Sequence, residues 1–295
     1  MPHRIVGIGE ILWDLLPSGA QLGGAPANFS CHASALGADA CVVSRIGMDA
    51  RGDGIFARLR DLHQNTAYLQ RDATRPTGTV TVDVDAMGQP RFEIHCDVAW
   101  DALEADQNAL RAVASADAVC FGTLAQRAET SRRAVRELVS AAPSHALRIL
   151  DVNLRQQYYS RTIIEESLAL ASVLKVNDTE LPRLAAMLSL TGDTHAQIDQ
   201  LADRWQLRAV ACTRGAFGSL LRTAHEWSDH PGIPTSVVDT VGAGDSFTAA
   251  MTLGLLNGWS LAEVNAQANR LASFVASQAG GTPLLPVTLT SAFAG

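Results

Sequence analysis

Short runs of apolar and β-branched residues alternate along the chain with longer segments of helical periodicity, and this alternation constrains the fold more than any other feature. The runs occupy residues 4–9, 40–47, 117–122, 147–153, 172–177 and 208–213. In segments between them, such as 127–142, apolar residues recur at the spacing of a helix face. Repeated β-α-β units of this kind predict an α/β fold, with a doubly wound and mainly parallel sheet flanked by helices. Ligands of such sheets gather at the carboxyl ends of the strands.

Two regions, residues 11–24 and 76–100, interrupt this alternation. Residues 79–86 and 91–98 each alternate apolar with polar side chains, and a turn signal separates them, so the second region predicts a β-hairpin with one polar face. A hairpin has no place inside a parallel sheet. We therefore expect a small β lid over the carboxyl ends of the strands, in which 76–100 pairs with 11–24. No linker or repeat divides the sequence, which predicts a single domain over 1–295.

The charge balance favours a small-molecule partner. A formal net charge of −7 disfavours nucleic acid and anionic membrane surfaces as main partners. Lys175 is the only lysine, and no Gly-Lys-Ser or Gly-Lys-Thr triplet exists, so a Walker-type phosphate loop is excluded. A bound phosphate would be held by arginine, backbone amides or a metal ion.

Cysteine usage and the N-terminus predict a cytoplasmic protein. The five cysteines are scattered and never form a C-x-x-C pair, so we expect reduced, buried core residues. The N-terminal apolar stretch is soon broken by Glu10 and Asp14, which does not fit a signal peptide.

The strongest local signal is DTVGAGDSF at residues 239–247. It follows a β-like run at 235–239 and precedes a helical pattern over 248–256 that stops at Asn257-Gly258. Gly242 and Gly244, on either side of Ala243, allow successive backbone amides to face one point at a helix N-terminus, which is a cradle for an anion. Asp245 then falls in the first helical turn, where we expect those donors and the helix dipole to keep it ionised as a general base. The alternative is a glycine-rich turn with Asp245 as a capping acid.

This motif resembles the second signature of the ribokinase-like (PfkB) carbohydrate kinases. Residues 23–37 (GGAPANFSCHASALG) together with 45–52 (RIGMDARG) resemble the first signature, and the resemblance covers essentially the whole chain. It implies a ribokinase-like fold and an ATP-dependent sugar kinase that uses Mg²⁺. Within it, Asp245 would deprotonate the attacking sugar hydroxyl. The amides of Gly242, Ala243 and Gly244 would stabilise the transferring phosphoryl group.

The resemblance also implies a nucleotide and metal site. Asn177 and Glu180 match an N-x-x-E motif that organises Mg²⁺ and phosphates through water, although the same pattern is an ordinary capping motif. Thr213, Gly215 and Gly218 match a nucleotide loop, and Asn269 falls where family members line the adenine pocket. A site for a monovalent cation, potassium, is left open at Asp239 and Thr240.

At the sugar end, the resemblance implies that Asp14 and Asn28 bind hydroxyl groups and that Gly24 lets the sugar approach the chain. Carboxylates and amides suit this task because they bond neighbouring hydroxyls directionally. Arg155, in a DVNLR strand end, is the expected cation near the phosphoryl group. The alternatives are an exposed turn acid for Asp14, a helix-capping residue for Asn28 and a solvated surface residue for Arg155.

The predicted lid is the best guide to the sugar. Arg91, the candidate lid contact to substrate, would share one face of the hairpin with Glu93, His95 and Asp97, so that face is mixed or net acidic and suits a neutral polyol. The segment GEILWDLLPSG also resembles fructokinase-type members, so we expect fructose. Ribose, a nucleoside or ketodeoxygluconate, and a non-catalytic sugar-binding protein, stay open as alternatives, as does a homodimer formed through unpaired lid edges.

Overall fold

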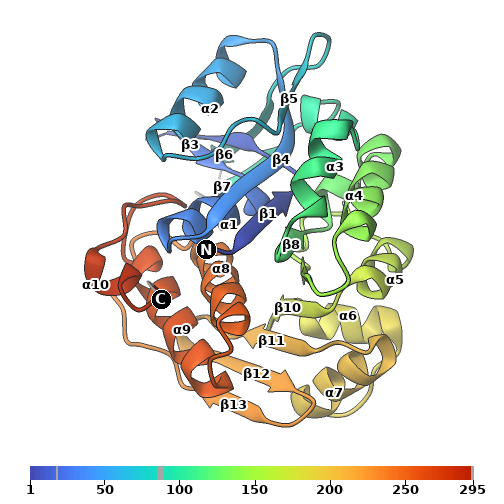
Figure 1. Cartoon of the computed structure of the whole chain (residues 1–295), viewed down its shortest axis with the longest axis vertical. Coiled ribbons are helices and arrows are strands. Elements are labelled where there is room, and N and C mark those ends of the chain that lie inside the picture. Colours follow the sequence, from blue (N-terminus) through green and yellow to red (C-terminus); the bar gives the residue numbers. More distant parts are fainter. Residues whose placement is uncertain (18, 85–89, 294–295) are drawn as a thin grey trace.

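Two β-sheets form the framework of the protein in a computed structural model that describes residues 1–17, 19–84 and 90–293 (Figure 1). The larger sheet has nine strands in the order β13-β12-β11-β10-β9-β8-β1-β4-β5, and the smaller has four in the order β3-β2-β6-β7. The large-sheet strands are β1 (Arg4–Ile8), β4 (Asp39–Gly47), β5 (Leu69–Asp72), β8 (Ala118–Phe121), β9 (Leu147–Asp151), β10 (Val173–Asn177), β11 (Ala209–Thr213), β12 (Ser219–Thr223) and β13 (Trp227–His230). The small-sheet strands are β2 (Leu12–Leu16), β3 (Gly19–Gly23), β6 (Gly78–Val84) and β7 (Pro90–Ile94).

Helices cover both faces of the large sheet. They are α1 (Ala25–Ala35), α2 (Ala50–Asp61), α3 (Gln107–Ala114), α4 (Glu129–Ala141), α5 (Arg161–Leu170), α6 (Leu181–Leu188), α7 (Thr194–Trp205), α8 (Ala243–Leu256), α9 (Leu261–Ala276) and α10 (Val287–Thr290), with 3₁₀ turns η1 (Ala99–Ala102), η2 (Leu124–Gln126) and η3 (Gly215–Phe217). Within the described ranges, no helix has both the length and the apolar character needed to cross a membrane.

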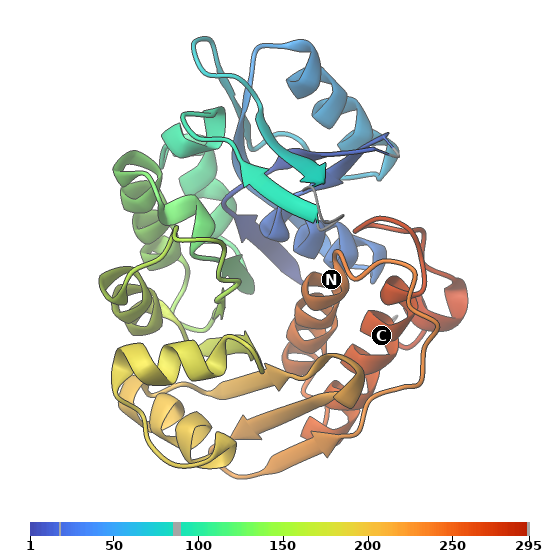
Figure 2. The same cartoon turned by 180° about the vertical axis from the view of Figure 1, so that it is seen from behind.

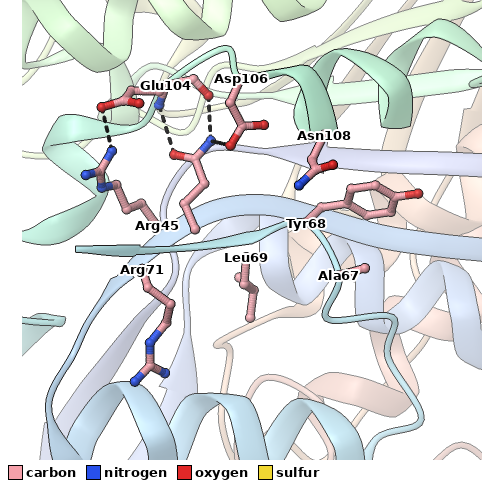
Figure 3. A pocket seen from close by; sticks show the side chains of 9 residues that line it. Arg45, Ala67, Tyr68, Leu69, Arg71, Glu104, Asp106 and Asn108 are labelled. Carbon is pink, nitrogen blue, oxygen red and sulfur yellow. Dashed lines mark hydrogen bonds and ion pairs between the residues drawn. The ribbon is translucent and has the colours of Figure 1, made fainter. Parts of the chain in front are cut away.

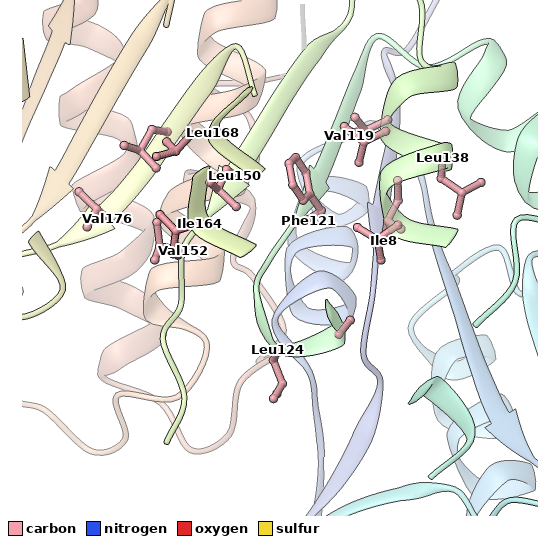
Figure 4. Close-up of a cluster of buried hydrophobic side chains, with 14 of the residues drawn as sticks. Ile8, Val119, Phe121, Leu124, Leu138, Leu150, Val152, Ile164, Leu168 and Val176 are labelled. Carbon is pink, nitrogen blue, oxygen red and sulfur yellow. The ribbon is translucent and has the colours of Figure 1, made fainter. Parts of the chain in front are cut away.

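Alternate residues of each central strand are buried in different cores. Val119 and Phe121 of β8 pack with helices α3 to α7, whereas Ala118 and Cys120 of the same strand pack with α1, α8 and α9. Figure 4 shows the first of these cores, where Phe121 and Leu150 from adjacent strands meet Leu138 and Ile164 from the covering helices. Burial on both faces explains why these strands read as continuous apolar runs. The predicted α/β fold with a mainly parallel sheet is confirmed.

The chain order reverses between β1 and β8. From β1 the chain adds β4 and β5 on one side, and then returns to place β8 through β11 on the other, all parallel to their neighbours. Such a switch point leaves a crevice at the carboxyl ends of the strands, where ligands bind in sheets of this type. Figures 1 and 2 show the small sheet and α2 at one end of the molecule and β10 to β13 at the other.

The small sheet pairs the two regions that interrupt the alternation. β2 pairs in parallel with β6, with Leu12 opposite Gly78, while β6 and β7 form the expected antiparallel hairpin. The hairpin is shorter than expected, because β7 ends at Ile94. Asp97 has left-handed backbone (φ 53°) and bonds Arg75 at 3.0 Å, so it does not continue the alternating face. The argument that Asp97 shares a lid face with Glu93 is therefore wrong.

Two further predictions fail in detail, and one pair of strands was not predicted. The antiparallel strands β12 and β13 at one sheet edge were not expected. Residues 235–239 form no strand, because their backbone is bonded to the end of α9 instead, with Val238 N donating to Ala276 O. Four of the five cysteines are buried as expected and all five are free, but Cys96 is exposed.

A buried arginine joins the small sheet to the main body. Arg127, just after η2, donates to both carboxylate oxygens of Asp101 in η1 at 2.8 Å and to the His95 carbonyl. Its guanidinium also lies 3.9 Å from the centre of the Trp100 ring. Both members of the ion pair are buried, with side-chain exposures of 5% and 7%.

We expect Arg127→Met to lower the free energy of unfolding by about 3 to 5 kcal/mol, because it leaves the Asp101 charge buried without its partner. Arg133→Met, at an exposed position of α4, is the matched control and should change stability by less than about 0.5 kcal/mol. Urea denaturation of both variants measures the difference. Equal losses would contradict the assigned role.

Candidate active site

The N-terminal turn of α8 requires its first glycine. Gly242 precedes the helix with φ 76°, a conformation that side chains rarely adopt. A Cβ there would lie 2.2 Å from the Gly281 carbonyl oxygen. The Ala243 amide donates to the Thr240 carbonyl at 3.3 Å, so it is less free than the expected cradle requires. The amides of Gly244 and Asp245 follow in the first helical turn, where N–H groups lack helical acceptors.

Asp245 meets Asn28 from the other end of the sequence. Asn28 Nδ2 donates to Asp245 Oδ2 at 2.8 Å, across the contact between α1 and α8 near the centre of Figure 1. Burial and the neighbouring Asp151 raise the pKa of Asp245 to about 6, against the opposing effects of Asn28, Lys175 and Arg155. Asp245 is expected to be ionised, and at this pKa it is still mostly ionised at neutral pH. Desolvation outweighs the dipole here.

Two further carboxyl groups share this region with Arg155. Glu10, which follows β1, is almost fully buried, and burial together with Asp245 raises its pKa to about 7. Burial also raises the pKa of Asp14 in β2 to about 6. Arg155, an exposed residue beyond β9, lowers the pKa of both and of Asp245, which puts all three carboxyls within its electrostatic reach. Sequence reasoning missed Glu10, although an acidic residue at the end of the first strand was the signal for it.

The backbone conformation and the close packing at Gly24 both require glycine. Its φ is 105°, and a Cβ would lie 2.5 Å from the Glu10 carbonyl oxygen. At the adjacent Gly23 a Cβ would lie 2.3 Å from Asp14 Oδ2. The glycine pair therefore lets β3 and α1 pass close to Glu10 and Asp14.

Asn177 and Glu180 cap the ends of two strands. Glu180 accepts from Leu154 N at 2.8 Å and from Asn177 N at 2.9 Å, one bond on each carboxylate oxygen. Asn177 Oδ1 accepts from the amides of Thr179 and Glu180. The capping geometry is thus present, and among the described residues no three His, Cys, Asp or Glu side chains gather to hold a metal ion. These groups fit a hydrated ion held through water, and not a cage of protein ligands.

The predicted nucleotide residues flank β11 and α9. Thr213 ends β11, and open space surrounds the Cβ position of Gly215, whereas a Cβ at Gly218 would lie 2.0 Å from the His230 carbonyl oxygen. Asn269 points inward, since its Nδ2 lies 2.7 Å from Ser219 Oγ and 2.9 Å from the Asn265 carbonyl oxygen. The space beside Gly215 is therefore open to a ligand, whereas the amide nitrogen of Asn269 is already hydrogen-bonded within the protein.

A loop that contains Gly280 and Gly281 packs over the N-terminal turn of α8, and sequence reasoning did not single it out. Asp239 Oδ1 accepts from Val241 N and its Oδ2 from Gly280 N, which ties the loop to the start of the DTVGAGD segment, while Thr240 is exposed. His32 of α1 bonds the Gly281 carbonyl at 2.9 Å, and burial lowers its pKa to about 4. The consecutive glycines 280 and 281 were the available signal. The side chain of Arg91 lies outside the part of the chain that the structure describes.

Two cavities lie apart from these residues. One, of about 250 Å³, is drawn in Figure 3 beside β5, and its polar lining is already paired: Arg45 bonds Glu104, and Gln70 bonds Asp106 and the backbone of Glu104. The other, of about 400 Å³, lies between residues 233–236, α9 and residues 286–289.

A doubly wound α/β protein with a carboxylate beside a glycine-rich helix terminus is suited to transferring an anionic group. The sequence pattern of the pfkB family carbohydrate kinases matches residues 19–288. The chain belongs to this family, and it is a carbohydrate kinase, as the resemblance implied.

Individual relatives agree with this assignment. A fructokinase of Klebsiella pneumoniae is 30% identical over 268 residues, which cover 86% of this chain and 85% of the relative. An aminoimidazole riboside kinase of Salmonella typhimurium is 28% identical over 307 residues, which cover 96% of this chain and 92% of the relative. In fold, the chain matches a Xylella fastidiosa fructokinase with bound ATP at a TM-score of 0.85 and 21% identity, over 98% of this chain and 97% of that one.

We expect Gly242→Ala to lose far more kinase activity than Gly258→Ala. Both glycines have positive φ, 76° and 70°, but only the Cβ at position 242 would collide with backbone. Displacing an amide that stabilises a transferring group typically lowers kcat by about 10²- to 10³-fold. Steady-state kinetics with melting temperatures compares the variants, and similar kcat values for both would contradict the prediction.

Proposed function

We propose that this carbohydrate kinase is a fructokinase, which transfers the γ-phosphoryl group of ATP to a hydroxyl group of fructose. The bond between Asn28 and Asp245 is the observation that carries the proposal, because it joins a candidate sugar-binding amide to the candidate base. Asp245 accepts the proton of the attacking hydroxyl, and the amides of Gly242 and Gly244 stabilise the phosphoryl group, since that of Ala243 is bonded to the Thr240 carbonyl. Arg155 neutralises charge on the outer side of that group.

A carboxylate with a pKa near 6 suits this chemistry. It is a stronger base than an ordinary aspartate and is still mostly ionised at neutral pH.

The acidic surroundings favour a neutral sugar. Glu10 lies near Asp245, and Arg155 is within electrostatic reach of these two carboxyls and of Asp14, so a sugar acid would bring a further carboxylate into an acidic region. A polyol instead supplies hydroxyl donors to these acceptors. The similarity to a fructokinase points to fructose among neutral sugars. A riboside is the competing acceptor, since an aminoimidazole riboside kinase is also a relative.

We propose that ATP binds as its Mg²⁺ complex. Asn177 and Glu180 keep lone pairs beyond those used in capping, and these would hold water of a hydrated ion whose main ligands are phosphates. The ion supplies charge neutralisation on the phosphate oxygens. Thr213, Gly215 and Gly218 would line the path of the nucleotide. Potassium at Asp239 and Thr240, sugar contact by Arg91, and a homodimer through the small sheet stay predictions.

We expect ATP consumption by the purified chain with Mg²⁺ to depend on fructose. A coupled assay of ADP release across fructose, ribose, glucose, ketodeoxygluconate, adenosine, aminoimidazole riboside and a no-acceptor control measures this. Preference for another acceptor would replace fructose and keep the kinase. Sugar binding without ATP consumption would instead favour the non-catalytic alternative.

Asp245→Asn should fold normally and bind sugar, because an asparagine oxygen can still accept the bond from Asn28. Loss of the base should lower kcat by about 10²- to 10⁴-fold. Asp61→Asn, at the exposed end of α2, is the matched control and should retain full activity. Turnover by Asp245→Asn equal to that of the wild type would exclude Asp245 as the base.

A further inference from the structure

The single lysine of the chain lies directly beneath the N-terminus of α8. Lys175 is buried in β10, and a Cβ built on Gly244 would lie 3.0 Å from its Nζ. In the sequence, this lysine belongs to no Walker-type phosphate loop. The fold nevertheless brings its ammonium group against the glycine-rich turn, from the side of the sheet.

An ion pair and a hydroxyl group hold the ammonium there. Lys175 and Asp151 are register partners on adjacent parallel strands, and Nζ donates to Asp151 Oδ1 at 3.1 Å. Thr248, one turn into α8, lies with its Oγ1 3.0 Å from Asp151 Oδ2 and 2.9 Å from the Gly244 carbonyl oxygen. The network therefore connects β9, β10 and the first turn of α8.

Lys175 interacts with more charged groups than its ion-pair partner Asp151 alone. Burial alone would lower the pKa of Lys175, but Asp151, Glu180 and Asp245 outweigh it and raise that pKa, so the ammonium stays charged. Buried ion pairs stabilise folds weakly, because desolvation offsets their attraction. A fixed positive charge in a low-dielectric site is, by contrast, effective at stabilising a developing negative charge.

We propose that Lys175 is a positioning residue of the phosphoryl-transfer site, which holds the first turn of α8 through Asp151 and Thr248 and adds a fixed positive charge behind the anion cradle. The inference rests on the proposed kinase function. The sequence has no phosphate-loop lysine. Lys175 instead acts through the backbone of Gly244 and does not touch the substrate.

The test compares Lys175→Met, Asp151→Asn and the double variant with the wild-type chain. Lys175→Met should lower kcat by about 10- to 100-fold, less than loss of a donor that touches the transferring group. KM for the sugar should stay unchanged. Because this variant leaves Asp151 buried and unpaired, its melting temperature should fall as well.

The double variant separates stability from chemistry. In the double variant, methionine and asparagine replace the charged pair by neutral side chains of similar size, so no unpaired Asp151 charge is left buried. The melting temperature should therefore return toward that of the wild type, while kcat stays low. Recovery of wild-type kcat in the double variant would overturn the proposal, because the pair would then serve only the fold.

Asp151→Asn alone gives a second readout that does not depend on the double variant folding. Lys175 keeps Glu180 and Asp245 as neighbours, so kcat should fall less than in Lys175→Met. Asp245 faces Asp151, Asn28, Lys175 and Arg155, with Glu10 nearby, and loss of the Asp151 charge lowers its pKa. Activity requires ionised Asp245, so the acid limb of the kcat profile, expected near pH 6 in the wild type, should move to lower pH. Equal kcat losses in the two single variants would contradict the proposal.

ATP binding without an acceptor distinguishes failure of this inference from failure of the proposed function. Calorimetric titration should show Lys175→Met weakened toward ATP by about 10-fold, as expected for loss of one fixed charge near the phosphates, with adenosine binding unchanged. A wild-type chain that neither binds nor consumes ATP would overturn both proposals. An active wild type with unaltered ATP affinity and kcat in Lys175→Met would overturn this one alone.

Discussion

Burial of the large sheet on both faces is the constraint on which the rest of the structure depends. Side chains of the central strands enter one apolar core or the other, so polar chemistry has to begin where the strands end. Glu10, Asn177 and Thr213 lie at or just beyond these ends. The ion pair of Asp151, the last residue of β9, with Lys175 lies inside the ladder. Each is tolerated in a buried register position because the other lies opposite it.

Desolvation then sets the electrostatic character of the candidate site. Asp245 stands at a helix N-terminus, where the dipole favours a carboxylate, yet its pKa is raised because burial and Asp151 outweigh that effect. Burial is also the main reason why the pKa values of Glu10 and Asp14 are raised. A solvated turn with the same sequence would have left Asp245 an ordinary weak base. Burial of this turn and the neighbouring charge of Asp151, and not the motif alone, raise the pKa of Asp245.

The sequence predicted what local patterns determine. Alternating runs located β1, β4 and the strands from β8 to β11, and the motif at 239–247 located the start of α8. Strand β13 was missed because its four residues, WSDH, are as polar as a surface loop, and β12 because its apolar part is only Leu220 and Leu221. Residues 235–239 have strand-like side chains but find no strand to pair with. The proximity of Lys175 to Gly244 could not be predicted from local sequence patterns, because it depends on how α8 packs on the sheet.

Internal bonds decide which of the predicted site residues can also serve a ligand. A carboxylate offers about four lone-pair positions, and the two backbone amides bonded to Glu180 use only two of them. Asn269 differs, because its amide group has two protons and both are directed at Ser219 and Asn265. It cannot donate to an adenine ring without breaking bonds that fasten α9 to β12. Asn269 therefore fastens α9 to β12, and its amide nitrogen has no proton left to donate to a ligand.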